Sequence, residues 1–180
     1  MLRSKTLLST LSFLCLLFGL AGAAHARSAT ADVFPTATND PDQKKLGVIL
    51  FTDTPNGLAI STSLKGLPPG KRGFHIHEVG DCGPTTKDGN VIPAGAAGGH
   101  WDPDKTGKHM GPGGSGHKGD LPPLEVADDG TAVTTLHVKN LTVGEIQNLA
   151  VIIHAGGDNF SDEPAPLGGG GPRFACGVIK

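Results

Sequence analysis

The amino-acid sequence predicts an all-β fold in a single domain. Two extended runs, at 46–54 and 57–64, flank Pro55 and Asn56, and a Pro-Asn-Gly sequence is a favourable hairpin turn. In the second run, Leu58 and Ile60 alternate with small or polar residues, which is the period of a half-buried strand. Only the segment 141–148 has a helical pattern, and it is short. Further strands are predicted by the segments GFHIHE (73–78), GTAVTTLHV (130–138), LAVIIHAG (149–156) and RFACGVI (173–179).

The first 26 residues have the three-part pattern of a secretory signal peptide. Arg3 and Lys5 precede an apolar run at 7–23, and the small residues that follow predict cleavage after Ala26. A membrane anchor is the alternative. The run is short for a transmembrane helix, however, and small residues rather than a charged stop come directly after it. We therefore expect the chain to be exported.

The remaining chain is expected to hold a loose N-terminal arm at 27–45 and a domain at 46–180. The arm is polar and contains two prolines. Cleavage leaves 154 of the 180 residues, an ordinary size for one domain. Arg3 and Lys5 are two of the 15 basic residues, so 13 remain against 17 acidic ones. No block of basic residues is present, which argues against a nucleic-acid partner.

Two cysteines, Cys82 and Cys176, remain after removal of the signal peptide. In an exported chain a single disulfide between them is the default expectation, and two unrelated thiols are the alternative. The bond would close a loop of about 95 residues, which stabilises a fold by roughly 4–5 kcal/mol in the chain-entropy description.

Two long segments, at 80–120 and 155–173, lack the period of a strand or a helix. The first carries eight glycines from Gly98 to Gly119, and the second contains a run of four at 168–171. Segments of this length in a compact β domain are usually functional or disordered. Few apolar residues are available to fold them, so a disulfide and a bound metal are the candidates for ordering them.

Histidines cluster around these segments. His75 and His77 lie two apart on a predicted strand, so they project from one face and can bind one metal. Two surface histidines on a polar face are the alternative. In the first long segment, three histidines and one carboxylate make a plausible tetrahedral zinc set, and a flexible histidine-rich loop is the alternative. That set is His100, His109, His117 and Asp120, while His154 ends a strand four residues before Asp158, and His137 is expected to be an ordinary strand residue.

Taken together, the motifs GFHIHE, GGHWDP, GDLP, HAGGDN, PLGGGG and RFACGVI resemble those of the copper-zinc superoxide dismutases, in particular the bacterial secreted branch. The resemblance covers almost all of the chain from residue 46 to Lys180. It implies a flattened eight-stranded Greek-key barrel or sandwich in which two long loops form the metal site. It also implies a periplasmic enzyme that dismutes superoxide to dioxygen and hydrogen peroxide. A histidine-bound copper is alternately reduced and reoxidised, beside a histidine-bridged structural zinc.

The resemblance further implies roles for individual residues. His100 would bridge one copper and one zinc per subunit and carry a proton to the reduced substrate. Asp158 would join a copper ligand to a zinc ligand by hydrogen bonds, and Arg173 would be the active-site guanidinium. Cys82 and Cys176 would form the family disulfide. The implied copper ligands are His75, His77, His100 and His154, and the implied zinc ligands are His100, His109, His117 and Asp120.

Two expectations concern the substrate and the partners. Superoxide is a small anion and the exported chain is acidic, so local positive charge has to attract it. Besides Arg173, Lys87 is a candidate for this steering, with an ordinary loop lysine as the equal alternative. Trp101 is the only tryptophan, in a glycine-rich loop with little local core, so we expect it at a homodimer contact. Packing of Trp101 within the domain is the alternative.

Two other function classes are alternatives to the enzyme. A periplasmic protein that stores or delivers copper and zinc needs the same histidines. It needs neither a shared bridging histidine nor Arg173 over the copper, so these features favour the enzyme. An adhesive β-sandwich leaves the clustering of the histidines unexplained.

Overall fold

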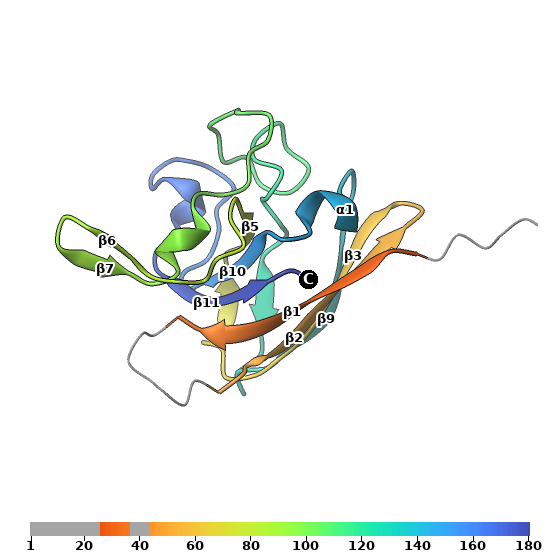
Figure 1. Cartoon of the computed structure of the whole chain (residues 1–180), viewed down its shortest axis with the longest axis horizontal. Helices are drawn as coiled ribbons and strands as arrows, with labels where there is room; N and C mark the ends of the chain where they lie inside the picture. The colour runs from red at the N-terminus through yellow and green to blue at the C-terminus, as the bar shows by residue number, and fades with distance from the viewer. Residues whose placement is uncertain (1–25, 37–43) are drawn as a thin grey trace, which may run out of the picture.

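The computed structural model describes residues 26–36 and 44–180, and the predicted all-β fold is confirmed. Seven strands form one antiparallel sheet in the order β5-β10-β11-β1-β2-β3-β9, which is strongly curled (Figure 1). The strands are β1 (Ser28–Pro35), β2 (Gly47–Thr54), β3 (Gly57–Leu64), β4 (Gly70–Arg72), β5 (Phe74–His77), β6 (Thr85–Lys87), β7 (Asn90–Ile92), β8 (Leu124–Val126), β9 (Ala132–Val138), β10 (Ala150–His154) and β11 (Arg173–Val178). The helical segments are α1 (Val143–Ile146), η1 (Gly95–Ala97) and η2 (Leu167–Gly169).

The pair β4 and β8 brings the barrel to the predicted eight strands. Only Gly73 separates β4 from β5, so the two count as halves of one strand. β8 pairs with β4 and lies next to β9, which brings the two edges of the curled sheet together. Neighbours such as β11 and β1 are far apart in sequence, as a Greek key requires. The remaining pair, β6 and β7, forms a hairpin that projects from the barrel (Figure 1).

The predicted hairpin between β2 and β3 is confirmed. The strands pair in register up to Thr54 and Gly57, which leaves Pro55 and Asn56 in the turn. Leu58 and Ile60 are buried on the alternate positions that the sequence predicts. Gly57 has a φ of +119°, and a Cβ atom there would lie 2.2 Å from a carbonyl oxygen of β9. Only glycine therefore fits where β3 begins.

The expected loose arm at 27–45 is wrong for residues 28–35. They form β1, which pairs with β2 on one side and β11 on the other. Ala29, Ala31 and Val33 are buried, and the residues between them are exposed. Burial does alternate along the strand. Alanine is only weakly apolar, however, and polar residues lie between the buried positions, so the composition alone predicts a polar arm. The domain therefore begins at β1 rather than at 46.

The predicted signal peptide, apart from Ala26, and residues 37–43 of the predicted arm lie outside the described residues. Over the residues that the structure describes, no helix is long and apolar enough to cross a membrane. The weak helical pattern at 141–148 corresponds to α1, a single turn. The backbone N–H of its first residue, Val143, donates to the Asp53 carboxylate at 2.7 Å and ties the turn to β2.

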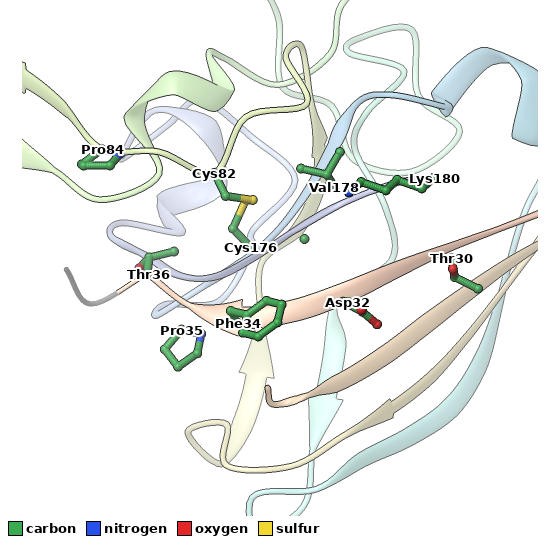
Figure 2. A pocket seen from close by; sticks show the side chains of 11 residues that line it. Thr30, Asp32, Phe34, Pro35, Thr36, Cys82, Pro84, Cys176, Val178 and Lys180 are labelled. Carbon is green, nitrogen blue, oxygen red and sulfur yellow. A yellow bond between two sulfur atoms is a disulfide. The ribbon is translucent and has the colours of Figure 1, made fainter. Parts of the chain in front are cut away.

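The expected disulfide between Cys82 and Cys176 is present and joins the first long segment to β11 (Figure 2). Cys176 belongs to a small second core that the segment forms against the outer face of β10 and β11. A groove of about 540 Å³ lies beside the disulfide, along the outer faces of β1 and β11 (Figure 2). None of the histidines lines this groove, so it is separate from the candidate site. The other members of the second core are Ala94, Ala97, Ala150 and Ile152.

Candidate metal centre

β5 aims two histidines away from the barrel core, as the sequence predicts. Phe74 and Ile76 are buried in the main core, and His75 and His77 project from the opposite face of the strand. Both rings are buried, with exposed fractions of 0% and 1%, because the long segments cover that face. The prediction that the pair points one way is therefore confirmed, and the alternative of two surface histidines is wrong.

The first long segment runs along the free side of β5 and makes backbone hydrogen bonds to it. The N–H of Ile76 donates to the carbonyl of Gly119 at 2.9 Å, and the N–H of Trp101 donates to the carbonyl of Ile76 at 2.8 Å. These bonds set His100 opposite His77 and Asp120 opposite His75. Backbone pairing therefore brings ligand types that lie 20 or more positions apart in sequence to one place.

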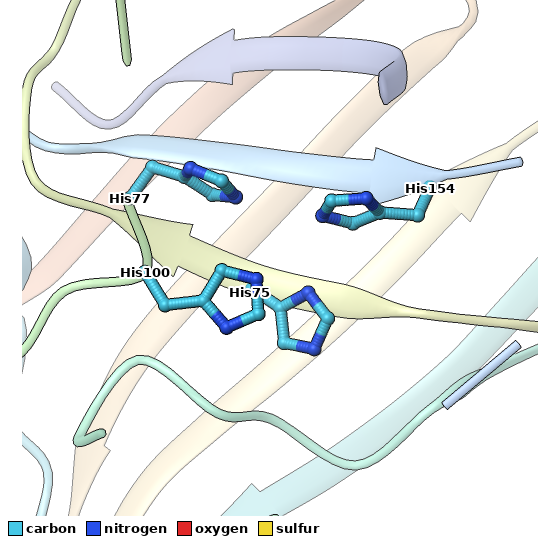
Figure 3. Close-up of side chains that lie close together, drawn as sticks. All are labelled: His75, His77, His100 and His154. Carbon is cyan, nitrogen blue, oxygen red and sulfur yellow. The ribbon is translucent and has the colours of Figure 1, made fainter. Parts of the chain in front are cut away.

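One group of four histidines is close enough to hold a single ion. Their ligand nitrogens all lie within 4.8 Å of one another, and all four residues are buried. Figure 3 shows the rings gathered beside β5 and β10. The members are His75, His77, His100 and His154.

A second group lies directly beside the first. His109 Nδ1 is 3.0 Å from Asp120 Oδ2, and His117 Nδ1 is 3.4 Å from Asp120 Oδ1. His100 Nδ1 is 3.1 Å from the same Oδ1 atom. The structure thus brings together the three imidazoles and one carboxylate that the sequence singles out. The group with all ligand atoms within 4.8 Å of one another is His75, His100, His109 and Asp120, with His117 at its margin.

The hydrogen bonds around the rings of the first group leave one nitrogen of each histidine free and buried. His77 Nδ1 bonds the Gly98 carbonyl at 3.0 Å, and His154 Nδ1 bonds the Gly171 carbonyl at 3.1 Å. These carbonyls can only accept, so each bonded nitrogen carries the proton and the other presents a lone pair inward. The buried nitrogens without a partner are His75 Nδ1, His77 Nε2, His100 Nε2 and His154 Nε2, and the buried His109 Nδ1 and His117 Nδ1 face the Asp120 carboxylate.

Asp158 joins the two groups through hydrogen bonds. Its Oδ2 atom lies 2.9 Å from His75 Nε2, and its Oδ1 atom lies 2.7 Å from His109 Nε2. The carboxylate fixes the orientation of both rings. Four inward nitrogens without a partner are expensive to bury beside a carboxylate that faces three rings, and cations with nitrogen ligands such as copper and zinc satisfy them. The residues present therefore fit both metals.

His100 belongs to both groups. Nδ1 faces Asp120 of the second group, and Nε2 points unpartnered into the first. Its ring stacks on His75 with the ring centroids 3.9 Å apart. A ring that offers one nitrogen to each group is the geometry that a shared ligand requires.

The same burial and charge set the proton affinities of the metal-free rings. Burial lowers the pKa of His77 to about 2 and that of His154 to about 3. Burial likewise lowers the pKa of His100 to about 4, although its bond to Asp120 works in the opposite direction. Burial would also lower the pKa of His109, but its bonds to Asp120 and Asp158 outweigh this and raise it to about 9. In the metal-free chain a proton on His109 thus supplies positive charge between two carboxylates.

We expect the stability of the metal-free protein to fall between pH 6.5 and pH 4. Unfolded histidine binds a proton near pH 6.5, whereas His77 and His154 in the fold do not until about pH 2 to 3. Because the unfolded state then binds more protons, its free energy falls as the pH falls. The contribution of His109 has the opposite sign, is fully present below pH 6.5 and is lost as the pH rises through about 9. Urea unfolding of the metal-free chain between pH 4 and pH 7 measures this, and a constant midpoint would contradict it.

Arg173 lies at the edge of the first group. Its guanidinium donates to the carbonyls of Ala94 and Gly98, and Gly98 is also the acceptor for His77. The arginine charge contributes to the lowered pKa values of His77 and His154, which places its field over that group. The acceptor carbonyls were missed by sequence reasoning, since a backbone oxygen carries no side-chain signal.

The other residues singled out from the sequence lie outside the cluster. Lys87 is exposed at the end of β6, in the hairpin that projects from the barrel (Figure 1). The hairpin itself was missed, although Asp88-Gly89 is a turn signal. Trp101 is half-buried and packs partly against the main core. His137 pairs with Ala59 across β3 and β9, so its reading as an ordinary strand residue is confirmed.

Asp162 is a further residue that the sequence did not single out. Its Oδ2 atom accepts from the N–H of His109 at 2.9 Å, and its Oδ1 atom accepts from the N–H of Leu167 at 3.1 Å. It therefore fixes the second long segment to the backbone of a candidate zinc ligand. Asp162 follows Ser161 in a segment without the period of a strand or a helix, which is why its contact was not predicted.

Comparison with known proteins gives one family. The profile of the family described as Copper/zinc superoxide dismutase (SODC) matches residues 45–179. The superoxide dismutase [Cu-Zn] of Escherichia coli strain K12 is 48% identical over 166 residues, which cover 91% of this chain and 96% of that protein. The enzyme of Brucella abortus is 45% identical over 164 residues, covering 89% and 93%.

Solved structures give the same result. The Cu/Zn superoxide dismutase from Brucella abortus superposes with a TM-score of 0.82 at 44% identity, over 86% of this chain and 100% of that one. The structure described as the monomeric copper, zinc superoxide dismutase from Salmonella enterica gives a TM-score of 0.75 at 48% identity, with the same coverage. The chain belongs to the copper/zinc superoxide dismutase family.

Proposed function

We propose that the two groups of ligands hold different metals in the superoxide dismutase activity of this chain. The first histidine group holds copper, and the second group, with His117, holds zinc. The observation that carries this proposal is the gathering of buried ring nitrogens, four of them unpartnered in the first group and two facing the Asp120 carboxylate in the second. Copper would be held by His75, His77, His100 and His154, and zinc by His100, His109, His117 and Asp120.

The reaction consumes two superoxide anions and two protons and yields dioxygen and hydrogen peroxide. When bound, copper supplies the change of oxidation state that lets one anion be oxidised and the next reduced. His100 is the proton carrier, because its Nε2 atom is the ring nitrogen of the bridging position that can take up and give back a proton. Asp158 keeps His75 and His109 in fixed orientations, so the ligands of the two groups keep fixed positions relative to one another.

Arg173 attracts the anion and holds it at the copper group. Its guanidinium is fixed by the carbonyls of Ala94 and Gly98, so little freedom is lost when the substrate arrives. We expect Arg173→Ala to lower the second-order rate constant by about tenfold or more, because a local cation over a cleft raises association rates by that order. Arg173→Lys should retain part of the rate, since it keeps the charge without the planar fork.

The test is superoxide consumption by the copper- and zinc-loaded chain at low and at high salt. A fast rate that falls with salt, and falls further in Arg173→Ala, supports the proposal. The matched control is Lys139→Ala, which removes an exposed cation after β9. A chain that binds both metals without turnover would instead be a storage or delivery protein.

Lys87 is proposed as a second, weaker source of attraction for the anion. It is exposed and carries no ion pair among the described residues. We expect Lys87→Ala to lower the rate constant a few-fold at low salt and to leave it unchanged at high salt, where exposed charges are screened. An unchanged rate at both salt concentrations would make Lys87 an ordinary loop lysine.

A homodimer with Trp101 at the contact is also proposed. The half-buried ring packs on one side against the core and leaves the rest of its surface for a partner. Sedimentation at micromolar concentration should give twice the chain mass, and Trp101→Ala should give the monomer mass. A monomer mass for the unaltered chain would contradict the dimer.

Export to the periplasm by a signal peptide at 1–26 completes the proposal. The Cys82–Cys176 disulfide supports an oxidising compartment. The mature chain should begin at Arg27, directly before β1. The intact mass of the protein purified from the periplasm of an expressing bacterium tests the cleavage site, and a mass that retains the first 26 residues would contradict it.

A further inference from the structure

Glu78 directly follows His77 in the sequence and forms two hydrogen bonds with Gly99, one as donor and one as acceptor. The Glu78 N–H donates to the Gly99 carbonyl at 3.1 Å, and the Gly99 N–H donates to the Glu78 carboxylate at 3.1 Å. This pair of bonds continues the backbone bridge between His77 and His100 by one more position. The Glu78 side chain is exposed and forms no ion pair among the residues described.

The neighbour of Gly99, Gly98, carries the carbonyl on which two site residues depend. His77 Nδ1 lies 3.0 Å from this oxygen, and the Arg173 guanidinium donates to it as well. Gly98 has a φ of +75° and a ψ of −156°, a conformation that only glycine adopts readily. A backbone of this kind persists only when its surroundings hold it in place.

The Glu78 carboxylate packs against this glycine, whose own N–H donates to the Gly95 carbonyl at 3.2 Å. A Cβ atom at Gly98 would lie 2.7 Å from Glu78 Oε2, so the carboxylate packs directly against the glycine. The same oxygen accepts the Gly99 N–H, which fixes the peptide that carries the Gly98 carbonyl. No other side chain bonds the backbone N–H or carbonyl of Gly99 in the described residues.

We propose that Glu78 is a positioning residue that aims the Gly98 carbonyl, and through it Arg173 and His77, at the copper group. The proposal rests on the role given to Arg173 above. The placement of a carboxylate here is otherwise unfavourable, because a negative charge near the site repels an anionic substrate. Its hydrogen bond to Gly99 supplies the reason for its presence.

Two substitutions separate the bond from the charge. Glu78→Gln keeps an acceptor oxygen for the Gly99 N–H and removes the charge, whereas Glu78→Ala removes both. We expect Glu78→Ala to lower the second-order rate constant by about tenfold, the order expected when a reacting group is displaced. We expect Glu78→Gln to match or exceed the unaltered enzyme at low salt. Glu125→Ala is the control, since it removes an exposed glutamate that pairs with Lys71 on β4 and β8.

A second measurement reports on the bond without turnover. Amide hydrogen exchange of Gly99 in the metal-loaded protein should be about tenfold faster in Glu78→Ala, the fold-change that corresponds to loss of a hydrogen bond to a charged group. It should rise less in Glu78→Gln, which keeps a neutral acceptor for the Gly99 N–H. Equal exchange rates in all three proteins, or an equal loss of rate constant in Glu78→Ala and Glu78→Gln, would overturn the proposal.

The Arg173→Ala background separates this proposal from the one it rests on. If Glu78 acts mainly through Arg173, Glu78→Ala should have little further effect once the arginine is gone. A full additional tenfold loss in that background would overturn the positioning of Arg173 by Glu78. If Arg173→Ala alone leaves the rate constant unchanged, the role of Arg173 is wrong, while the exchange of Gly99 still tests the bond that Glu78 makes.

Discussion

Removal of both metals is expected to lower the midpoint of thermal unfolding by about 10 °C or more. A ligand present at 1,000 times its dissociation constant stabilises the native state by about 4 kcal/mol. For a domain of this size, each kcal/mol corresponds to about 2–4 °C. The physical reason is the set of buried ring nitrogens, of which four have no hydrogen-bond partner within the protein and two face only the Asp120 carboxylate. Calorimetry of the loaded and the chelator-treated protein measures the difference.

Two histidine variants make this test specific. His117→Ala removes a proposed zinc ligand at the margin of the second group and should lower the unfolding midpoint of the zinc-loaded protein toward that of the metal-free one. His137→Ala removes a histidine on β9, outside the cluster, and should leave the midpoint and the zinc content unchanged. Equal midpoints with and without metal would show that the centre does not stabilise the fold.

Loss of the disulfide is the second large effect that we expect. Replacing Cys82 and Cys176 by serine frees a loop with a sequence separation of 94 residues, and a loop of about that length is worth roughly 4–5 kcal/mol. The rate constant should fall as well. The segment that follows Cys82 carries the carbonyls of Ala94 and Gly98, and Arg173 lies three residues before Cys176. Both sides of the arginine contact are therefore released.

The measurements are denaturant unfolding and superoxide consumption of the metal-loaded double variant. A reductant should destabilise the unaltered protein toward the variant and leave the variant itself unchanged. Unaltered stability together with an unaltered rate would contradict the expectation. Unaltered stability with a lowered rate would show that the bond acts on the site and that the rest of the fold holds its shape without it.

Much of the metal centre could be predicted because it obeys short-range rules. Strand period alone places His75 and His77 on one face, and the glycine-rich segment supplies the imidazoles and carboxylate of a zinc set. What could not be predicted depends on contacts between distant parts of the chain. β1 is held between β2 and β11, and its partners on β11 lie some 140 positions away. The Gly98 and Gly171 carbonyls that orient the rings have no side chain to reveal them.

The hydrogen bonds between the first long segment and β5 have a consequence for self-association. Through them an irregular segment occupies the place of a neighbouring strand, so the backbone of Ile76 is not open to another molecule. An uncovered strand edge is a template for pairing with a second chain and for aggregation. With the proposed ligands, the metals would hold that segment through His100 and Asp120. Metal loss would then favour exposure of an edge that can pair with a second chain, and the same ions that serve the chemistry would limit aggregation.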